Sequence, residues 1–226
     1  MVEIVKNIEG IRSRLPMSVE LVAVSKTHPV EYIVEAYSCG QRIFGENKVQ
    51  EMDQKHEALK ESCPDIKWHL IGHLQTNKVK YIAPYVTMIE AVETIKLLRE
   101  INRQAERCGR VIKVLLELHI AEESTKFGLT LDACRELLAA GEWREMSHVQ
   151  ICGLMMMASF VDDQEQIRRE MQTAADFFDE VKARYFADDD AFCERSWGMS
   201  DDYPIACQTR STMVRIGTAI FGPRVY

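Results

Sequence analysis

The chain has 226 residues, is 46% hydrophobic and 28% charged, and carries a formal net charge of −7. That length suits one α/β barrel or one to two smaller domains, and the ordinary share of charged residues excludes wholesale disorder. The negative charge argues against a general nucleic-acid-binding protein, which needs a basic surface to neutralise phosphates. It does not exclude a small anionic ligand, because the charge of a local site can oppose the overall sign.

No signal peptide or membrane span is predicted. Residues 1–15 alternate apolar and charged residues at helical spacing, and no apolar run in the chain approaches the ~18 residues of a transmembrane helix. The seven cysteines form no CxxC pair. A scattered, odd set of this kind is typical of a reducing compartment, so we expect a cytoplasmic protein with no membrane partner.

Short apolar, β-branched runs alternate with longer segments of helical period along the chain. The predicted strands are Glu20–Lys26, Arg42–Gly45, Lys67–Gly72, Thr87–Ala91, Lys113–Ile120, Gln150–Met157, Cys193–Gly198 and Thr212–Thr218. The predicted helices between them are Val30–Ser38, Val49–Leu59, Lys78–Ile82, Thr94–Cys108, Leu131–Ala140, Asp163–Phe186 and Asp202–Thr209. This alternation predicts parallel strands with crossover helices, and several strands are apolar enough to be buried on both faces.

Eight such strand–helix units favour closure into a (β/α)8 barrel over an open sheet. After the last predicted strand, residues 220–226 are too few for a covering helix. The N-terminal segment supplies one, because an apolar stripe at helical spacing is formed by Val2, Val5, Ile8, Ile11 and Leu15. We therefore predict a single domain over residues 1–226, with an extra N-terminal helix packed beside the final strand.

Lys26 is the candidate reactive group of the first strand. In a β/α barrel the reactive side chains lie at the carboxyl ends of the strands, where the loops meet at one mouth. Lys26 ends the first predicted strand, in the run AVSKTHP. A partly desolvated lysine holds more of its neutral form and attacks aldehydes readily, so Lys26 is a candidate Schiff-base former. The alternatives are a lysine that reaches solvent at the mouth or one that pairs with Glu46.

The last two strands end in groups suited to a phosphate. Barrel enzymes often hold a phosphate with the loops that follow the seventh and eighth strands. After the eighth strand, Gly217 permits close backbone approach and Thr218 offers an amide and a hydroxyl. After the seventh, Ser200 is placed to contact the same phosphate or to cap the next helix. Arg215 can hydrogen-bond a ring nitrogen or pair with an anion.

The second and third strands contribute weaker candidates. Asn47 follows the second strand, in FGENKVQE, where it can donate to a ligand or cap the next helix. His69 and His73 lie in WHLIGHLQTNK, and a buried histidine satisfied by protein groups is the more common role for either. His69 and Trp68 must point to opposite faces of a strand, so one of the two faces the barrel interior. The histidines show no metal-ligand spacing, and we predict no metal site.

Taken together and in order, these strand ends resemble one family. The matching segments, over about residues 20–226, are AVSKTHP, FGENKVQE, WHLIGHLQTNK, ESTKFG, GLMMMAS, WGMSDD and STMVRIGTAIFGPRVY. The series is similar to the pyridoxal phosphate homeostasis proteins (the YggS/PROSC family), which resemble the barrel domain of alanine racemases. The resemblance implies an α/β fold with a single (β/α)8 barrel of the alanine-racemase N-terminal-domain type.

The resemblance also implies pyridoxal 5′-phosphate as the cofactor, held as a Schiff base. The residues that it implies in cofactor binding are Lys26, Asn47, His69, Ser200, Arg215, Gly217 and Thr218. Lys26 would bond to the cofactor, while the phosphate would be surrounded by Ser200, Gly217 and Thr218. Arg215 would face the pyridine nitrogen. Asn47 and His69 would lie near the cofactor ring.

Little or no catalysis is expected from this site. An arginine opposite the pyridine nitrogen disfavours its protonation and weakens the ring as an electron sink. Racemisation also needs an acid–base group on each face of the substrate. In the racemases the second group comes from a C-terminal β domain, which we expect this chain to lack, and Tyr226 at the mouth is a poor substitute. No catalytic residue is therefore predicted.

The expected function is a carrier in vitamin B6 homeostasis that holds pyridoxal phosphate and releases it to apo-enzymes, acting as a monomer. One alternative is a pyridoxal-phosphate-dependent amino-acid racemase that uses the same Lys26. Another is a Schiff-base aldolase that uses Lys26 without a cofactor. Should another lysine anchor the cofactor, the candidates are Lys48, Lys78 and Lys126.

Overall fold

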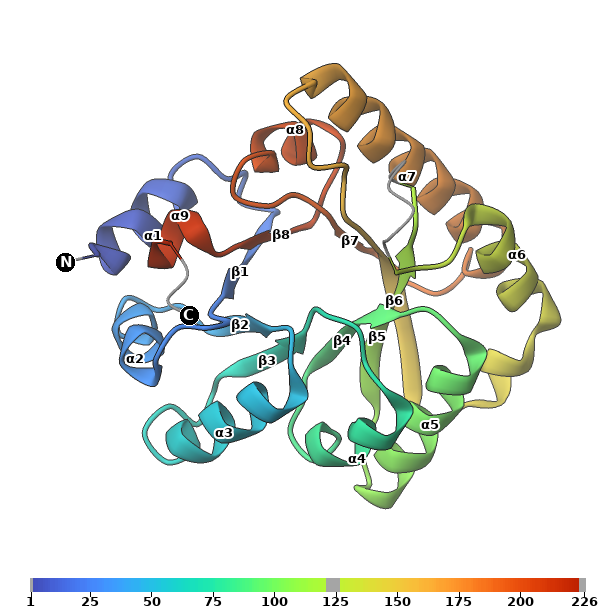
Figure 1. Cartoon of the computed structure of the whole chain (residues 1–226). Helices are drawn as coiled ribbons and strands as arrows, with labels where there is room; N and C mark the ends of the chain where they lie inside the picture. The colour runs from blue at the N-terminus through green and yellow to red at the C-terminus, as the bar shows by residue number, and fades with distance from the viewer. Residues whose placement is uncertain (1, 121–126, 224–226) are drawn as a thin grey trace.

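A closed parallel barrel forms the centre of the molecule. The computed structural model describes residues 2–120 and 127–223. The strands join in the order β1-β2-β3-β4-β5-β6-β7-β8, and β1 pairs with both β2 and β8, which closes the ring. Helices cover the outside of this ring (Figure 1). The predicted α/β class and (β/α)8 barrel are confirmed.

The strands are short, and the helices that follow them vary in length. The strands are β1 (Glu20–Val24), β2 (Ile43–Glu46), β3 (Lys67–Leu70), β4 (Met88–Val92), β5 (Ile112–Leu118), β6 (Val149–Met156), β7 (Glu194–Ser196) and β8 (Met213–Ile216). The α-helices are α1 (Ile4–Arg12), α2 (Val30–Ser38), α3 (Val49–Leu59), α4 (Val79–Ile82), α5 (Ile95–Arg107), α6 (Leu131–Ala140), α7 (Gln164–Tyr185), α8 (Tyr203–Gln208) and α9 (Thr218–Phe221). Two 3-10 helices, η1 (Thr76–Lys78) and η2 (Glu142–Glu145), complete the set within the described residues.

Two of the predicted strand ends were wrong in a way that matters for function. Lys26 was placed at the end of the first strand, but β1 ends at Val24 and Lys26 lies in the turn that follows. Thr218 was placed in the last strand, but β8 ends at Ile216 and Thr218 begins the one-turn helix α9. Both residues therefore lie just beyond the strands, at the mouth of the barrel.

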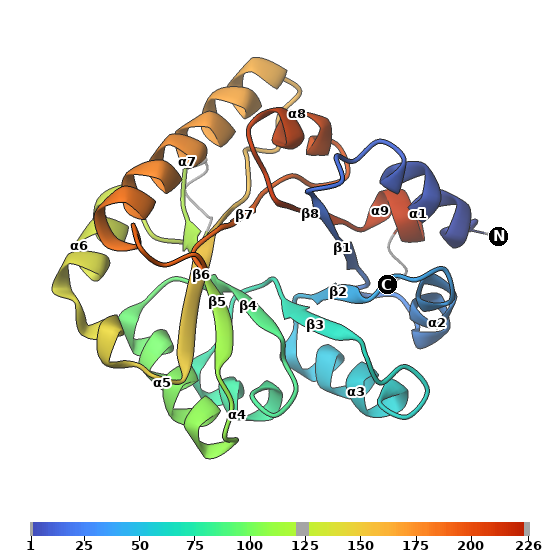
Figure 2. The same ribbon diagram turned by 180° about the vertical axis from the view of Figure 1, so that it is seen from behind.

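The N-terminal helix covers the seam where the barrel closes. α1 buries Ile8 and Ile11 of the predicted apolar stripe, together with Ile4, which the prediction did not include, while Val5 is only half-buried. It packs against α2 and α9 and lies beside α9 in both views of the ribbon (Figures 1 and 2). The side-chain amide of Asn7 donates to the carbonyl oxygen of Ile220 over 2.9 Å. Together α1 and α9 take the position of the helix that would follow the last strand.

The barrel interior has an apolar part and a polar part. Successive strand residues point alternately into the barrel and out toward the helices. The apolar interior cluster is made of Val22, Ile43, Met88, Ala91, Leu115, Cys152, Met155 and Met213. The polar interior side chains, all buried, are His69, Glu90, Glu117, Ser196 and Arg215. A much larger apolar cluster joins the outer faces of the strands to the helices.

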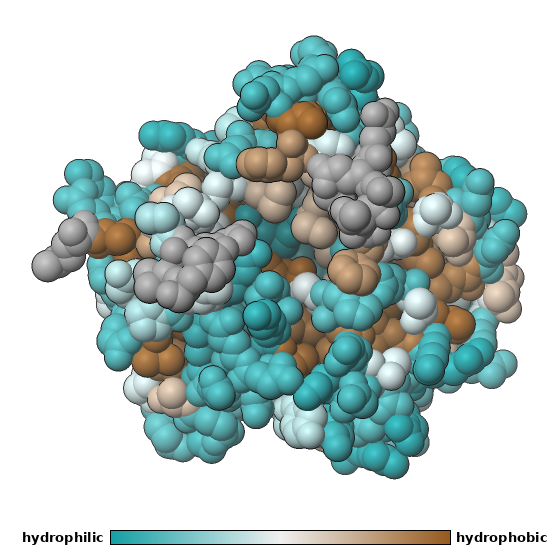
Figure 3. Space-filling model, viewed as in Figure 1, coloured by the Kyte–Doolittle hydropathy of each residue, from teal (hydrophilic) through white to brown (hydrophobic). Residues whose placement is uncertain are grey.

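The face of the molecule seen in Figure 1 carries many hydrophilic groups at its edge (Figure 3). On the face seen in Figure 3, hydrophilic groups occupy most of the periphery and apolar groups show around the middle. Within residues 2–120 and 127–223, no helix combines the length and the apolar character needed to cross a bilayer.

Candidate functional site

A cavity of about 750 Å³ opens at the carboxyl ends of the strands. Its walls come from the loops after β1, β6, β7 and β8, with Ile71 from the loop after β3. Cofactor pockets commonly enclose roughly 300–1,000 Å³, so the volume suits a small cofactor. A smaller groove of about 380 Å³ lies at the opposite end of the barrel, near Arg12 and Lys67. That end of a β/α barrel normally serves stability, so the first cavity is the candidate site.

The cavity brings together residues from opposite ends of the chain. Of the seven residues implied in cofactor binding, five line it: Lys26, Ser200, Arg215, Gly217 and Thr218. Asn47 and His69 do not line it. The alternative anchors Lys48 and Lys78 also lie outside the lining, while Lys126 and Tyr226 are beyond the described residues.

Lys26 lies at the tip of a tight turn between β1 and α2. The amide of His28 donates to the carbonyl oxygen of Ser25 over 3.1 Å, which closes this turn. Thr27, the next residue, has a φ of 66°, a left-handed conformation that β-branched residues rarely adopt. Glu46 does not take the role of partner that the sequence allowed, since its carboxylate bonds Lys55 at 2.7 Å and Ser25 at 2.6 Å.

The loops after β7 and β8 meet at the other side of the cavity. A Cβ atom on Gly217 would lie 3.2 Å from the carbonyl oxygen of Val24, so a bare α-carbon suits this close approach to β1. The amide of Ala219 donates to the hydroxyl of Ser200 over 3.4 Å and joins the two loops. A hydroxyl that accepts one hydrogen bond can still donate its own proton. Ser200 and the backbone near Gly217 therefore form a set of donors suited to an anion.

Helix capping does not explain Ser200 or Asn47. Asp202 occupies the N-cap position of α8, and Lys48 occupies that of α3. Neither side chain makes a capping hydrogen bond. Asn47 keeps a buried Oδ1 atom without a hydrogen-bond partner among the described residues. A Cβ atom on Gly72 would lie 2.7 Å from the carbonyl oxygen of Asn47, so only glycine permits this packing. A buried acceptor without a donor is costly, which points to a ligand or water beside Asn47.

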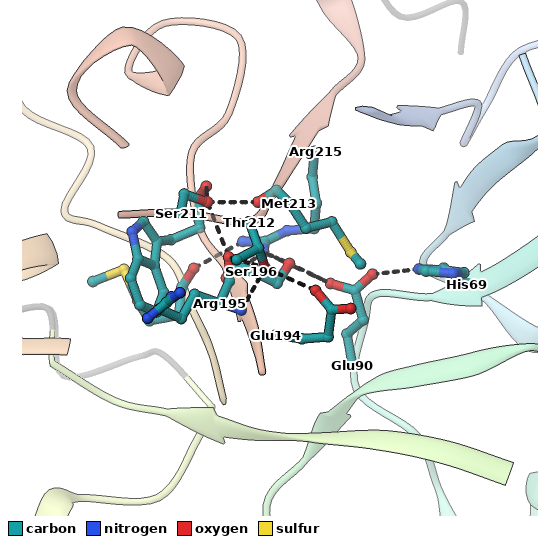
Figure 4. A network of polar contacts seen from close by, with 11 residues as sticks. His69, Glu90, Glu194, Arg195, Ser196, Ser211, Thr212, Met213 and Arg215 are labelled. Carbon is teal, nitrogen blue, oxygen red and sulfur yellow. Dashed lines mark hydrogen bonds and ion pairs between the residues drawn. The ribbon is translucent and has the colours of Figure 1, made fainter. Parts of the chain in front are cut away.

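Arg215 forms the polar floor of the cavity. Its side chain is buried, with a residue exposure of 4%. Nη1 donates to the carbonyl oxygen of Ser196 at 2.7 Å and to its hydroxyl at 2.5 Å, while Nη2 donates to the carbonyl oxygen of Met156 at 2.8 Å. The carboxylate of Glu90 lies 3.7 Å from Nη1. Figure 4 shows these groups converging inside the barrel.

His69 belongs to this network rather than to the cavity wall. Its Nδ1 lies 2.8 Å from Oε1 of Glu90, and the hydroxyl of Ser196 donates to the other oxygen of Glu90 over 2.6 Å (Figure 4). Burial alone would raise the pKa of Glu90, but the hydrogen bond from His69 and the charge of Arg215 hold that pKa below its usual range. A buried carboxylate thus lies directly behind the arginine.

A second buried carboxyl group lies near Arg215. Burial raises the pKa of Glu117 to about 7, and repulsion from Glu93 adds to the rise, while the charge of Arg215 acts in the opposite direction. Burial lowers the pKa of Arg215, whereas Glu90, Glu117 and Asp202 raise it. The charge of the floor therefore depends on the protonation of Glu117.

The sequence did not reveal the buried groups that hold the lining residues in place. Glu90 and Ser196 were not singled out, although a glutamate within the apolar run of β4 is a visible signal. Ser159 was also missed; its amide and hydroxyl both donate to the buried carboxylate of Glu170, each over 2.7 Å. That pair fixes the loop after β6 that lines the cavity. The described residues include no cluster of three or more metal-ligating side chains.

Comparison with known proteins agrees with this architecture. Residues 2–225 match the family model for the alanine racemase N-terminal domain. The chain is 38% identical to the pyridoxal phosphate homeostasis protein of Vibrio alginolyticus, over 100% of both chains. It is 37% identical to the human protein of that name, covering 91% of this chain and 77% of that one.

Solved structures show the same barrel. PipY of Synechococcus elongatus, solved without pyridoxal phosphate, superposes with a TM-score of 0.91 at 35% identity, over 97% of this chain and 100% of that one. PipY with pyridoxal phosphate bound gives a TM-score of 0.88 at 34% identity. An alanine racemase of Clostridium difficile shares the fold alone, with a TM-score of 0.76 at 14% identity, over 98% of this chain and 60% of that one. The chain therefore belongs to the alanine racemase N-terminal domain family and, among its members, to the pyridoxal phosphate homeostasis proteins.

Proposed function

We propose that this chain binds pyridoxal 5′-phosphate through Lys26 and serves vitamin B6 homeostasis, with little or no catalysis. The observation that carries the proposal is the convergence of Lys26 with Ser200 and Gly217 in one cavity of suitable volume. An amine and a group of anion-binding donors therefore line the same cavity. The naming of the full-length relatives and the ligand of PipY support the same assignment.

The lining residues fit the groups of this cofactor, which supplies an aldehyde and a phosphate when bound. Lys26 in its neutral form would supply the amine that condenses with the aldehyde, with loss of water. Ser200, Gly217 and Thr218 would hold the phosphate. Arg215 would lie at the pyridine nitrogen and disfavour its protonation.

Asn47 and His69 act from positions outside the lining. We propose that the amide of Asn47 orients the ring side of the ligand, in agreement with its unsatisfied buried oxygen. His69 is proposed to act indirectly, because its ring nitrogen lies 2.8 Å from the carboxylate of Glu90, which lies behind Arg215. Both assignments keep these residues in the binding of the cofactor without assigning them a reaction step.

A carrier is favoured over a racemase. The relatives that match over most of their length are named for homeostasis, whereas the likeness to alanine racemases is one of fold. An arginine at the ring nitrogen also weakens the stabilisation of a carbanion. We propose a single-domain monomer over residues 1–226 that acts in the cytoplasm and passes the cofactor to apo-enzymes. The seven cysteines, all free, are compatible with a reducing compartment.

Replacement of Lys26 tests the anchor. Apo-protein mixed with pyridoxal phosphate should develop a visible absorption band, and Lys26→Ala should abolish it and weaken binding by about 100-fold, equivalent to roughly 3 kcal/mol. Lys48→Ala is the matched control, because Lys48 is exposed in the neighbouring loop and does not line the cavity. If Lys26→Ala keeps the band while Lys48→Ala loses it, the anchor is assigned to the wrong lysine.

A second assay separates the carrier from the two enzymes. The loaded protein is incubated with L-alanine in heavy water, and deuterium at the α-carbon and D-alanine are measured over time. We expect no more exchange than free pyridoxal phosphate gives. Accumulation of D-alanine with turnover would establish the racemase, and the absence of any band in the wild-type protein would favour the aldolase.

A further inference from the structure

The two peptide groups on either side of Lys26 are both held by α3. Before Lys26, the carbonyl oxygen of Ser25 accepts from Nζ of Lys55 over 2.7 Å. After Lys26, the amide of Thr27 donates to Oε1 of Glu51 over 2.5 Å. Glu51 and Lys55 stand one helical turn apart and pair with each other at 2.7 Å. One ion pair therefore bonds the backbone on both sides of the reactive lysine.

This ion pair is anchored in a buried polar cluster. Lys55 makes a third contact, at 2.7 Å, with Oε1 of Glu46, and Ser25 donates its hydroxyl to the same oxygen over 2.6 Å. The side chain of Glu46 is fully buried, that of Lys55 is 7% exposed and that of Glu51 is 23% exposed. All three donors of the ammonium are used, which fixes its position. A buried, fully bonded cation is a rigid support for the turn.

The turn needs such a support because Thr27 is strained. A β-branched residue at a φ of 66° is strained and persists only where its surroundings hold it. Without the hydrogen bond to Glu51, the backbone would relax toward ordinary φ values, and the side chain of Lys26 would change direction. Covalent attachment is sensitive to such a change, because the amine must meet the carbonyl carbon at the correct distance and angle.

We propose that Glu51 and Lys55 are positioning residues for Lys26, which hold its backbone so that the amine reaches the ligand in the reactive orientation. This rests on the proposed binding of pyridoxal phosphate through Lys26. Neither residue lines the cavity, so their effect is transmitted through the backbone of the turn. They should influence the covalent part of binding and leave the phosphate contacts unchanged.

The test compares two ligands on two variants of the same helix. Pyridoxal phosphate can bond to the lysine, whereas pyridoxine 5′-phosphate carries an alcohol in place of the aldehyde and reports only the other contacts. Glu51→Ala removes the acceptor for Thr27 and should weaken pyridoxal phosphate binding by about tenfold, in line with the loss of one charged hydrogen bond. Binding of pyridoxine phosphate should stay the same. Glu57→Ala is the control, because the exposed Glu57 on the same helix pairs with Lys60 at 2.6 Å and does not line the cavity, and it should affect neither ligand.

A conservative variant guards against a purely structural effect. Glu51→Gln keeps an oxygen that can accept from Thr27, so its loss of pyridoxal phosphate affinity should stay below about threefold. Equal losses for both ligands in Glu51→Ala, no loss for either, or a glutamine variant as weak as alanine would each overturn the positioning role. Failure of the proposed function looks different, because the wild-type protein itself would then form no covalent adduct with pyridoxal phosphate.

Discussion

Arg215 is a buried cation in the floor of the cavity. A guanidinium in a barrel interior needs partners, and it finds them in two carbonyl oxygens, one hydroxyl and the carboxylate of Glu90. Because Glu90 is in turn bonded to His69 and Ser196, its position is fixed from three sides. Arg215 therefore presents a rigid positive charge to the cavity.

Glu117 makes the stability of the protein depend on pH. Its pKa is about 7 in the folded protein against an ordinary 4.5, so the folded state favours the protonated form. The stability from this shift is complete below pH 4.5 and is lost as the pH rises toward 7. Glu117→Gln is neutral at every pH and escapes this loss. When the pH rises from 5 to 8, the free energy of unfolding of the wild type should therefore fall by about 2 kcal/mol relative to that of the Glu117→Gln variant.

Urea unfolding at the two pH values measures this difference. Glu136→Gln is the matched control, because Glu136 is an exposed glutamate on α6, and it should follow the wild type at both values. A Glu117→Gln variant whose free energy of unfolding runs parallel to that of the wild type would show that Glu117 is ionised in the folded protein at pH 5.

For single residues, the sequence predicted which side chains lie at the mouth of the barrel better than it predicted which groups they contact. The rule that reactive groups follow barrel strands depends on topology alone, and it placed Lys26, Ser200 and Gly217 at the mouth. The role of His69 depends on Glu90, which is in another strand. Alternation showed only that His69 and Trp68 face opposite ways. The structure puts Trp68 in the outer apolar cluster and His69 beside Glu90.

At the scale of elements, the predicted order was confirmed but several strands are shorter than predicted. Ile71 directly follows β3 and Ile120 lies two residues after β5, so apolar, β-branched composition alone does not mark where a strand ends. Pairing ends where the loops turn toward the cavity, as Lys26 and Thr218 show. The one-turn helix α9 was not predicted, because four residues are too few for a periodic signal.

The contact between β6 and β7 depends on a single glycine. Gly153 pairs with Glu194, and a Cβ atom at Gly153 would lie 1.8 Å from the carbonyl oxygen of Glu194. Gly153→Ala should therefore force the two strands apart and lower the free energy of unfolding by about 3 kcal/mol. The measurement is chemical denaturation, followed by circular dichroism.

Gly10 provides the control for this substitution. It lies within α1, and an added Cβ atom would meet nothing within 4 Å. Gly10→Ala should stabilise the protein by about 0.5–1 kcal/mol, because alanine is the better helix former. Equal effects of the two substitutions would mean that the close approach of β6 and β7 is not required.

At the scale of the whole molecule, the site exists because the barrel closes. The proposed anchor, Lys26, follows the first strand, while the proposed anion donors follow the last two, and β1 pairs with β8 in register between Glu20–Ala23 and Met213–Ile216. α1 and α9 cover this seam from outside (Figure 1). The eight alternating units predicted the closure and helical spacing predicted the covering helix, whereas the depth of the cavity depends on side-chain packing that neither pattern encodes.

Reductive labelling tests the binding of pyridoxal phosphate through Lys26 most directly. The wild-type protein is loaded with pyridoxal phosphate, treated with borohydride, digested and mapped by mass spectrometry. We expect one label per chain, on the peptide that contains Lys26. A label on another lysine, or a protein that binds the cofactor without any reducible bond, would contradict the proposal.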